Sequence, residues 1–176
     1  MRVVSGTHGG RELVAPKGME TRPTSDRVRE ALFSILGDLD GARVLDLFAG
    51  SGALAIEALS RGAAAATLVD SSAAAIGAIR RNLAALQIDA EVVRRPALAF
   101  LGGARMHGRQ YDLVFLDPPY RRANVLGREL TVALVPVLAA GARVVTESDR
   151  RSPLELELPL RDQRRYGDTL IRIHAA

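Results

Sequence analysis

The pattern of apolar and polar positions divides the chain into strands that alternate with helices. Short continuous apolar runs are typical of strands buried on both faces, and they predict strands over residues 44–48, 66–69, 90–94, 111–116 and 143–147. Apolar residues at helical spacing predict helices over residues 22–36, 53–60, 72–86, near 97–101 and within 123–135. This order is typical of α/β proteins with a doubly wound, mostly parallel sheet and helices on both of its faces.

Two further segments flank the alternating region. Residues 1–20 contain two short extended pieces around a glycine-rich turn, which predicts a small N-terminal β-hairpin extension ahead of a main domain over residues 21–176. Near the other end, residues 154–158 and 169–174 alternate in polarity on either side of a polar stretch. This pattern predicts a closing antiparallel hairpin.

The predicted first helix combines a buried stripe with basic residues. Its apolar residues recur at helical spacing and form one stripe, consisting of Val28, Ala31, Leu32, Ile35 and Leu36. Arg27 and Arg29 lie off this stripe, near a helix N-terminus that itself favours anions. Both arginines are therefore candidate contacts for a phosphate backbone; the alternative for each is an ordinary solvated helix face.

Composition bears mainly on the kind of partner. The chain has no cysteine, and no apolar run is long enough for a signal peptide or a membrane span, so we expect a cytoplasmic protein without a membrane partner. The net charge is +4, and Lys17 is the single lysine among 24 basic residues. Arginine binds phosphate and stacks on bases, which favours a nucleic acid. An arginine- and alanine-rich genome would produce the same enrichment. The positions of individual arginines therefore have to decide whether a nucleic-acid partner is favoured.

A glycine-rich turn follows the first predicted strand. Gly50 and Gly52 lie between that strand and the next helix, and Asp70 ends the second strand 20 residues after Gly50. The carboxyl ends of parallel strands meet at one edge of a sheet, where such folds bind their ligands. Gly50-x-Gly52-x-x-Ala55 with a following acid also fits the dinucleotide fingerprint, so an NAD-binding oxidoreductase is an alternative.

The stretch Asp117-Pro118-Pro119-Tyr120 follows the predicted strand 111–116 directly. Neither proline has a backbone N–H, so the strand ends there and the backbone is held stiffly. The Asp117 carboxylate and the Pro118 carbonyl can accept the two hydrogens of an exocyclic base amine, while Tyr120 stacks on the ring. The alternative interpretation is a strand end with a proline turn.

Electrostatics help to choose between the two cofactors. A dinucleotide would place its pyrophosphate at the glycine turn, where carboxylates are unfavourable. S-adenosylmethionine (AdoMet) carries a sulfonium and an ammonium group, and both Asp46 and Asp117 would favour these cations. Asp70 would bind ribose hydroxyls in either case. The expected cofactor is therefore AdoMet.

The histidines do not indicate a metal site or a hydride-transfer acid. His8, His107 and His174 lie away from the predicted strand ends, and no two of them have a metal-ligand spacing. We expect all three in turns or at the surface.

With these motifs, the chain resembles the RsmD-type family of bacterial methyltransferases, class I AdoMet-dependent enzymes that methylate N2 of a guanine in small-subunit (16S) ribosomal RNA. The resemblance runs nearly end to end, through residues 9–11, 22–33, 48–54, 57–61 and 117–120. The Arg-Pro-Thr segment at 22–24 is its specific part, because the other motifs occur across many methyltransferases. It implies a Rossmann-like methyltransferase sheet.

The residues and the resemblance together assign three sets of site residues. Candidate catalytic residues are Asp117, Pro118 and Tyr120. Candidate cofactor-binding residues are Asp46, Phe48, Gly50, Gly52, Asp70 and Ala97. Candidate RNA-binding residues are Arg22, Arg27, Arg29, Arg121 and Arg122. Such folds often have Asp or Asn directly before the Ala97 position to hold the adenine amine. This chain has Pro96 there, which leaves the Ala97 backbone for that contact.

The expected partner is 16S rRNA, within a 30S subunit or an assembly intermediate, bound by a monomeric enzyme without a metal. A methyltransferase acting on adenine N6 or cytosine N4 of DNA would use the same four residues of the Asp-Pro-Pro-Tyr stretch. However, the chain is short for one and shows no separate target-recognition segment. A non-enzymatic RNA-binding module would not need the glycine turn and Asp70 together.

Overall fold

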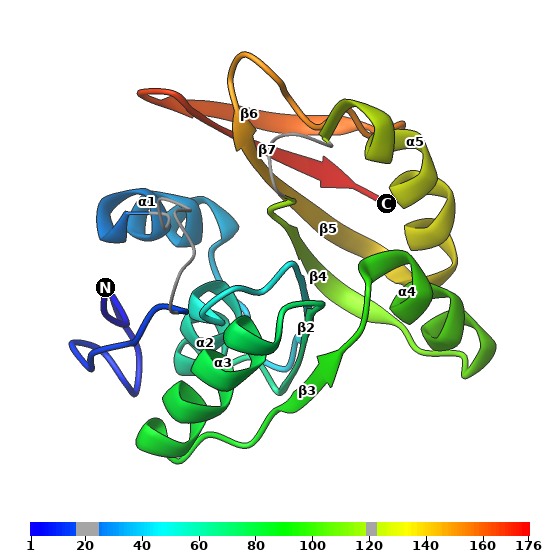
Figure 1. The fold of residues 1–176 in the computed structure, drawn as a ribbon. Coiled ribbons are helices and arrows are strands. Elements are labelled where there is room, and N and C mark those ends of the chain that lie inside the picture. Colours follow the sequence, from blue (N-terminus) through cyan, green and yellow to red (C-terminus); the bar gives the residue numbers. More distant parts are fainter. Residues whose placement is uncertain (17–24, 119–122) are drawn as a thin grey trace.

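Seven strands form one sheet in the order β3-β2-β1-β4-β5-β7-β6 (Figure 1). The computed structural model describes residues 1–16, 25–118 and 123–176. The strands are β1 (Arg43–Leu47), β2 (Ala65–Asp70), β3 (Glu91–Arg94), β4 (Tyr111–Leu116), β5 (Leu138–Asp149), β6 (Leu160–Tyr166) and β7 (Thr169–Ala175). Strands β1 to β5 pair in parallel, and β7 lies antiparallel between β5 and β6. The predicted α/β fold class with a doubly wound, mostly parallel sheet is confirmed.

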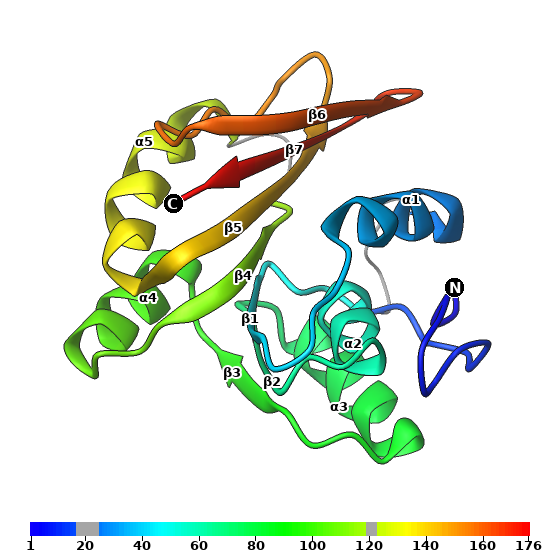
Figure 2. The same ribbon diagram turned by 180° about the vertical axis from the view of Figure 1, so that it is seen from behind.

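Helices cover both faces of this sheet (Figure 2). They are α1 (Asp26–Leu36), α2 (Ala53–Ser60), α3 (Ala73–Leu86), α4 (Ala97–Met106) and α5 (Ala123–Leu134), with the short 3-10 helix η2 (Val135–Val137) after α5. Residues of α1, α2 and α3 form one buried cluster with Leu113 and Phe115 of β4, whereas α4 and α5 form another with Val114 and Leu116. Side chains of a strand point alternately to its two faces, which is why β4 is apolar at every position over residues 113–116.

Helix α1 ends at Leu36 as predicted, but it begins at Asp26 and buries a different face; residues 22–24 of the predicted helix lie outside the described residues. Ser25 is its N-cap, with Oγ accepting from the Val28 N–H at 3.3 Å. Arg29 and Phe33 are buried in place of Ala31 and Ile35, and the side chain of Ile35 is 38% exposed. The predicted stripe is therefore wrong at these positions. Phe33 is buried in preference to Ile35 because its ring packs against Phe115, with the ring centroids 5.8 Å apart.

The closing hairpin is confirmed, but its first strand was misplaced. Residues 154–158 do not form a strand; Leu154 and Leu156 are buried against the cluster that α4 and α5 cover. The polar stretch that follows forms β6 instead. Most of the β6 side chains are exposed to solvent, and a polar sequence is compatible with backbone pairing in this edge strand.

The N-terminal extension is a hairpin with a single antiparallel bridge, between Arg2 and Glu12. The N–H groups of Val4 and Ser5 donate to the Glu57 carboxylate of α2 at 2.7 and 3.0 Å. At Gly6, a Cβ atom would lie 1.8 Å from the Ser60 carbonyl oxygen, so only glycine permits this approach. The hairpin is thus firmly seated on α2. The predicted boundary at residue 20 lies outside the described residues.

A second anchor joins the hairpin to α3. Asn82 is 2% exposed; its Oδ1 accepts from the Val14 N–H at 2.8 Å, and its Nδ2 donates to the Val14 carbonyl at 3.0 Å. The same Nδ2 donates to the Ser51 carbonyl at 2.9 Å. One carboxamide therefore holds the extension and the turn after β1 together. Over the described part of the chain, no helix has the length and apolar character needed to cross a membrane.

Candidate functional site at the carboxyl edge of the sheet

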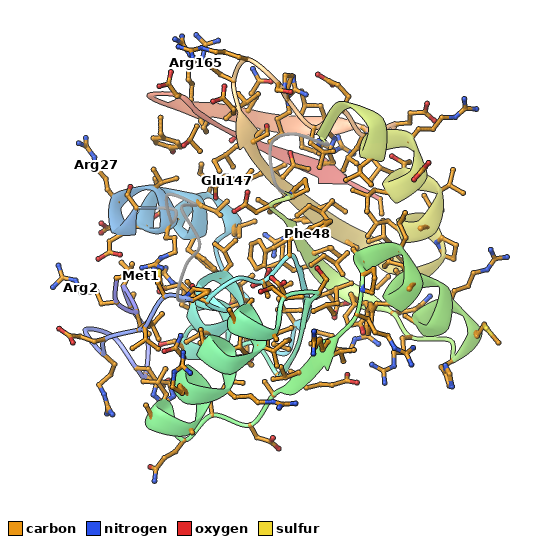
Figure 3. The ribbon with its side chains drawn as sticks, in the orientation of Figure 1. Met1, Arg2, Arg27, Phe48, Glu147 and Arg165 are labelled. Atoms are coloured by element: carbon orange, nitrogen blue, oxygen red, sulfur yellow. The ribbon has the colours of Figure 1, made fainter. Side chains whose placement is uncertain are left out.

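Four acidic side chains gather at the carboxyl ends of the parallel strands. Asp46 comes from β1, Asp70 from the end of β2, Asp117 follows β4, and Glu147 lies near the end of β5. In Figure 3, Glu147 and Phe48 lie toward the middle of the view; Glu147 is buried, and Phe48 is half-buried. The sequence brings the three aspartates to one edge, because each is at or near the end of a parallel strand.

The turn after β1 has an unusual backbone. Gly50 and Gly52 have φ angles of +57° and +79°, and Phe48, which is not a glycine, has +67°. Such left-handed conformations in a residue other than glycine are characteristic of functional sites. A Cβ atom on Gly52 would lie 2.8 Å from a methyl group of Leu68, whereas a Cβ on Gly50 would meet nothing closer than 4.0 Å. Gly52 therefore permits close helix packing, and Gly50 leaves space above the turn.

Asp70 organises this turn through its carboxylate. Its Oδ2 accepts from the Gly50 N–H at 2.9 Å, and its Oδ1 accepts from the Ser72 N–H at 2.8 Å. The backbone carbonyl of Asp70 accepts from the Arg95 N–H at 3.1 Å, which brings the start of α4, including Ala97, beside the turn. Each carboxylate oxygen retains a lone pair for a ligand hydroxyl.

Asp46 is buried beneath the turn. Its Oδ2 accepts from the Ala55 N–H in the first turn of α2 at 3.2 Å. Burial raises the pKa of the Asp46 carboxyl to about 7; the hydrogen bond from Ala55 opposes this shift, and the nearby charge of Asp70 adds to it. Near neutral pH the Asp46 carboxyl is therefore only partly ionised.

Asp117 and Glu147 form a pair across two neighbouring strands. Leu116 pairs with Thr146 in the parallel ladder, so the residues that follow lie side by side. Burial raises the pKa of the Asp117 carboxyl well above its usual range, and the charges of Glu147 and Asp46 raise it further. We did not identify Glu147 from the sequence. The available signal was an acid at the carboxyl end of the predicted strand 143–147, one position beyond the residue that pairs with the end of β4.

The candidate RNA-binding arginines do not all lie at the surface. Arg27 is exposed on α1, but Arg29 is fully buried, and its Nη2 donates to Asp26 at 2.7 Å and to the Arg2 carbonyl. Burial also lowers the pKa of Arg29. The prediction that Arg29 lies off the buried face is wrong: Asp26 and the Arg2 carbonyl accept from its Nη2, while its Nε and Nη1 are buried without a hydrogen-bond partner among the described residues. Arg29 is therefore not available to contact a phosphate.

Several predicted site residues lie outside the described part of the chain. They are Arg22, Tyr120, Arg121 and Arg122. Pro118 is described and is buried next to Asp117. The roles assigned to all five of these residues stay predictions.

The histidines take no part in the carboxyl edge. The prediction of a turn or surface position is wrong for His174, which is 3% exposed in β7 and pairs there with Val144. Its Nδ1 lies 3.1 Å from the Leu158 carbonyl, and burial lowers its pKa. Within the described residues, no three potential ligands are grouped to hold a metal ion.

The sheet order, the glycine turn after β1, the acid that ends β2 and the Asp-Pro pair after β4 together define a class I AdoMet-dependent methyltransferase fold. The match to a family model makes the assignment more specific: residues 1–175 match the family described as "Conserved hypothetical protein 95", and the chain belongs to this family, the RsmD-type methyltransferases.

Individual relatives agree with this assignment. The chain is 45% identical over 124 residues to ribosomal RNA small subunit methyltransferase D of Escherichia coli strain K12, a match that covers 69% of this chain and 61% of that enzyme. It is 41% identical over 162 residues to YlbH of Bacillus subtilis, a candidate rRNA methyltransferase, covering 90% and 86% of the two chains. The solved structure of YhhF, a candidate methyltransferase from Escherichia coli, superposes with a TM-score of 0.84 at 37% identity, covering 99% and 97%.

Proposed function

We propose that the protein transfers a methyl group from AdoMet to the exocyclic N2 amine of a guanine in small-subunit (16S) ribosomal RNA. The observation that carries this proposal is the position of Asp117 and Pro118, which directly follow β4 at the edge where Asp70 holds the glycine turn. The family membership and the rRNA methyltransferases among the relatives support it. We further propose that a monomer acts in the cytoplasm on a 30S subunit or an assembly intermediate.

The residues at the edge fit the proposed cofactor. Gly50 leaves open space above the turn, and Asp70 has carboxylate lone pairs available to ribose hydroxyls. The raised pKa values of Asp46 and Asp117 mark a site where negative charge lacks full compensation, and a sulfonium and an ammonium group would supply it. A pyrophosphate would add further negative charge, so these residues favour AdoMet over NAD. When bound, AdoMet supplies an electrophilic methyl group on a positively charged sulfur.

The chain's own residues would then position the target amine. The lone pair of guanine N2 is delocalised into the ring, so the amine is a weak nucleophile. The Asp117 carboxylate and the Pro118 carbonyl would accept its two hydrogens, which favours a pyramidal nitrogen whose lone pair points at the methyl group. Once methylated, the nitrogen would be acidic, and Asp117 or water would take its proton. A strong base is not required.

AdoMet should bind more tightly as the pH rises toward about 7. In the free protein the pKa of Asp46 is raised to about 7, whereas a bound cation favours the ionised carboxylate, so binding at lower pH has to release a proton. The association constant should therefore increase by up to about tenfold per pH unit below pH 7. Calorimetric titrations between about pH 5.5 and about pH 7 measure this slope while the AdoMet ammonium stays charged. Asp46→Asn should flatten it; an equally steep slope in that variant would contradict the role of Asp46.

The reaction itself can be tested with 30S particles from a strain that lacks this family of enzyme. The expected product after incubation with AdoMet is N2-methylguanosine at one position of 16S rRNA, identified by digestion to nucleosides and mass spectrometry. Double-stranded DNA and NAD serve as the comparison substrate and ligand. Methylation of adenine or cytosine in DNA would instead support the DNA amino-methyltransferase, and NAD binding would support the oxidoreductase.

A further inference from the structure

The β6–β7 hairpin extends beyond the catalytic edge. β4 ends at Leu116, which pairs with Thr146, whereas β5 continues to Asp149, which pairs with Thr169 at the start of β7. The hairpin thus continues for three more residues, or about 10 Å at 3.3 Å per residue. The tip of this hairpin projects on the side of the molecule where α1 lies (Figures 1 and 2).

Ion pairs use the acidic side chains of this hairpin. Asp162 binds Arg164 at 3.1 Å, and Asp168 binds Arg150 at 2.9 Å. Arg165 is exposed near the hairpin turn and makes no ion pair with any residue that the structure describes. Because the nearest acids already have partners, the free charge of Arg165 is available to an anion from outside.

The strand register places Arg165 close to the site. Arg165 pairs with Leu170, and Leu170 pairs with Ser148, one residue beyond Glu147. β6 is three strands from β4, which is about 14 Å at a strand spacing of about 4.8 Å. Figure 3 shows Arg165 on the same margin of the molecule as Arg27, with Glu147 further inside. An extended nucleotide chain can span this distance within a few residues of the target base.

We propose that the β6–β7 hairpin is a second contact for the RNA backbone, with Arg165 binding a phosphate on the same margin of the molecule as Arg27 but on a separate element. This inference rests on the proposed function. RNA fits this surface because its repeating phosphates can pair with separated arginines on two elements, α1 and β6. Contacts to phosphate position the strand without reading its sequence, so the hairpin would orient the RNA around the target guanine.

Neutralising single arginines tests this surface. The variants are Arg165→Gln and Arg27→Gln, with Arg81→Gln as the matched control, because Arg81 is an exposed arginine on α3. Binding of a 16S rRNA transcript is measured over a series of salt concentrations. Arg165→Gln and Arg27→Gln should each reduce the slope of log K against log salt by about 0.7–0.9, and the double variant by about twice that. Arg81→Gln should leave the slope unchanged.

AdoMet affinity and thermal unfolding are measured on the same samples, so that a folding defect is not mistaken for lost binding. Wild-type protein that binds neither AdoMet nor RNA would overturn the proposed function itself. Wild-type protein that binds both, with Arg165→Gln behaving like Arg81→Gln, would overturn the hairpin contact alone. In that case Arg165 would serve to keep an exposed edge strand from pairing with other chains.

Discussion

Replacing Asp117 with alanine is expected to reduce methyl transfer by about 100-fold or more, while AdoMet affinity changes far less. The change removes one of two acceptors that orient the target amine, and the loss of such a positioning contact has effects of this size. The glycine turn and Asp70 are untouched, because their hydrogen bonds do not involve Asp117. Single-turnover methylation of 30S particles, with AdoMet binding measured in parallel, separates the two effects.

A second variant at the same edge tests the role of Asp117 from the opposite direction. The Glu147 charge helps to raise the pKa of Asp117, so Glu147→Gln should lower that pKa. The ionised carboxylate is the form that accepts from the amine. The acidic limb of the pH–rate profile should therefore move to lower pH in this variant.

An Asp117→Ala enzyme with a nearly normal single-turnover rate would return Asp-Pro-Pro-Tyr to the interpretation as a structural turn.

Asp70→Ala should have its main effect on AdoMet binding. A lost contact between a charged acceptor and ribose is worth about 1–3 kcal/mol, and here the variant also deprives the Gly50 and Ser72 N–H groups of their acceptor. We therefore expect weakening toward the upper end of that range, measured by calorimetry. Asp70→Asn keeps an acceptor oxygen and should fall between alanine and wild type.

Asp112→Ala provides the matched control for this second prediction. Asp112 is also an aspartate on a parallel strand, but it lies near the start of β4, at the opposite edge of the sheet, where it pairs with Arg43 at 3.0 Å. Its loss should leave AdoMet affinity unchanged. Equal affinities for Asp70→Ala and Asp112→Ala would show that Asp70 does not hold the cofactor.

The central sheet could be predicted from the sequence because its strands are covered on both faces. The predicted bounds of α2 and β4 agree with the structure at both ends, since a doubly covered strand such as β4 gives a continuous apolar run. Asp46, Asp70 and Asp117 were also predictable as neighbours. Each lies at or near the carboxyl end of a parallel strand, so the topology alone brings them together.

The errors occur where burial depends on contacts between distant segments. Arg29 is buried because Asp26 and the Arg2 carbonyl accept from it, and the contact between α1 and the N-terminal extension leaves no local pattern. β6 was missed for a related reason. The strand β6 is held by backbone pairing with β7, whereas its own sequence is mostly polar and exposed and therefore predicts a loop. Leu154 and Leu156 alternate like a strand, but they are buried by packing against the α4–α5 side of the molecule.

The Asn82 carboxamide has a consequence for protein engineering. This single side chain hydrogen-bonds both the Val14 backbone and the Ser51 carbonyl. The N-terminal hairpin therefore cannot be replaced independently of the turn after β1. A chimera that takes its hairpin from a relative would also need compatible residues at positions 57, 60 and 82, where the hairpin is seated. Without them, a graft intended to alter RNA recognition would disturb the cofactor turn as well.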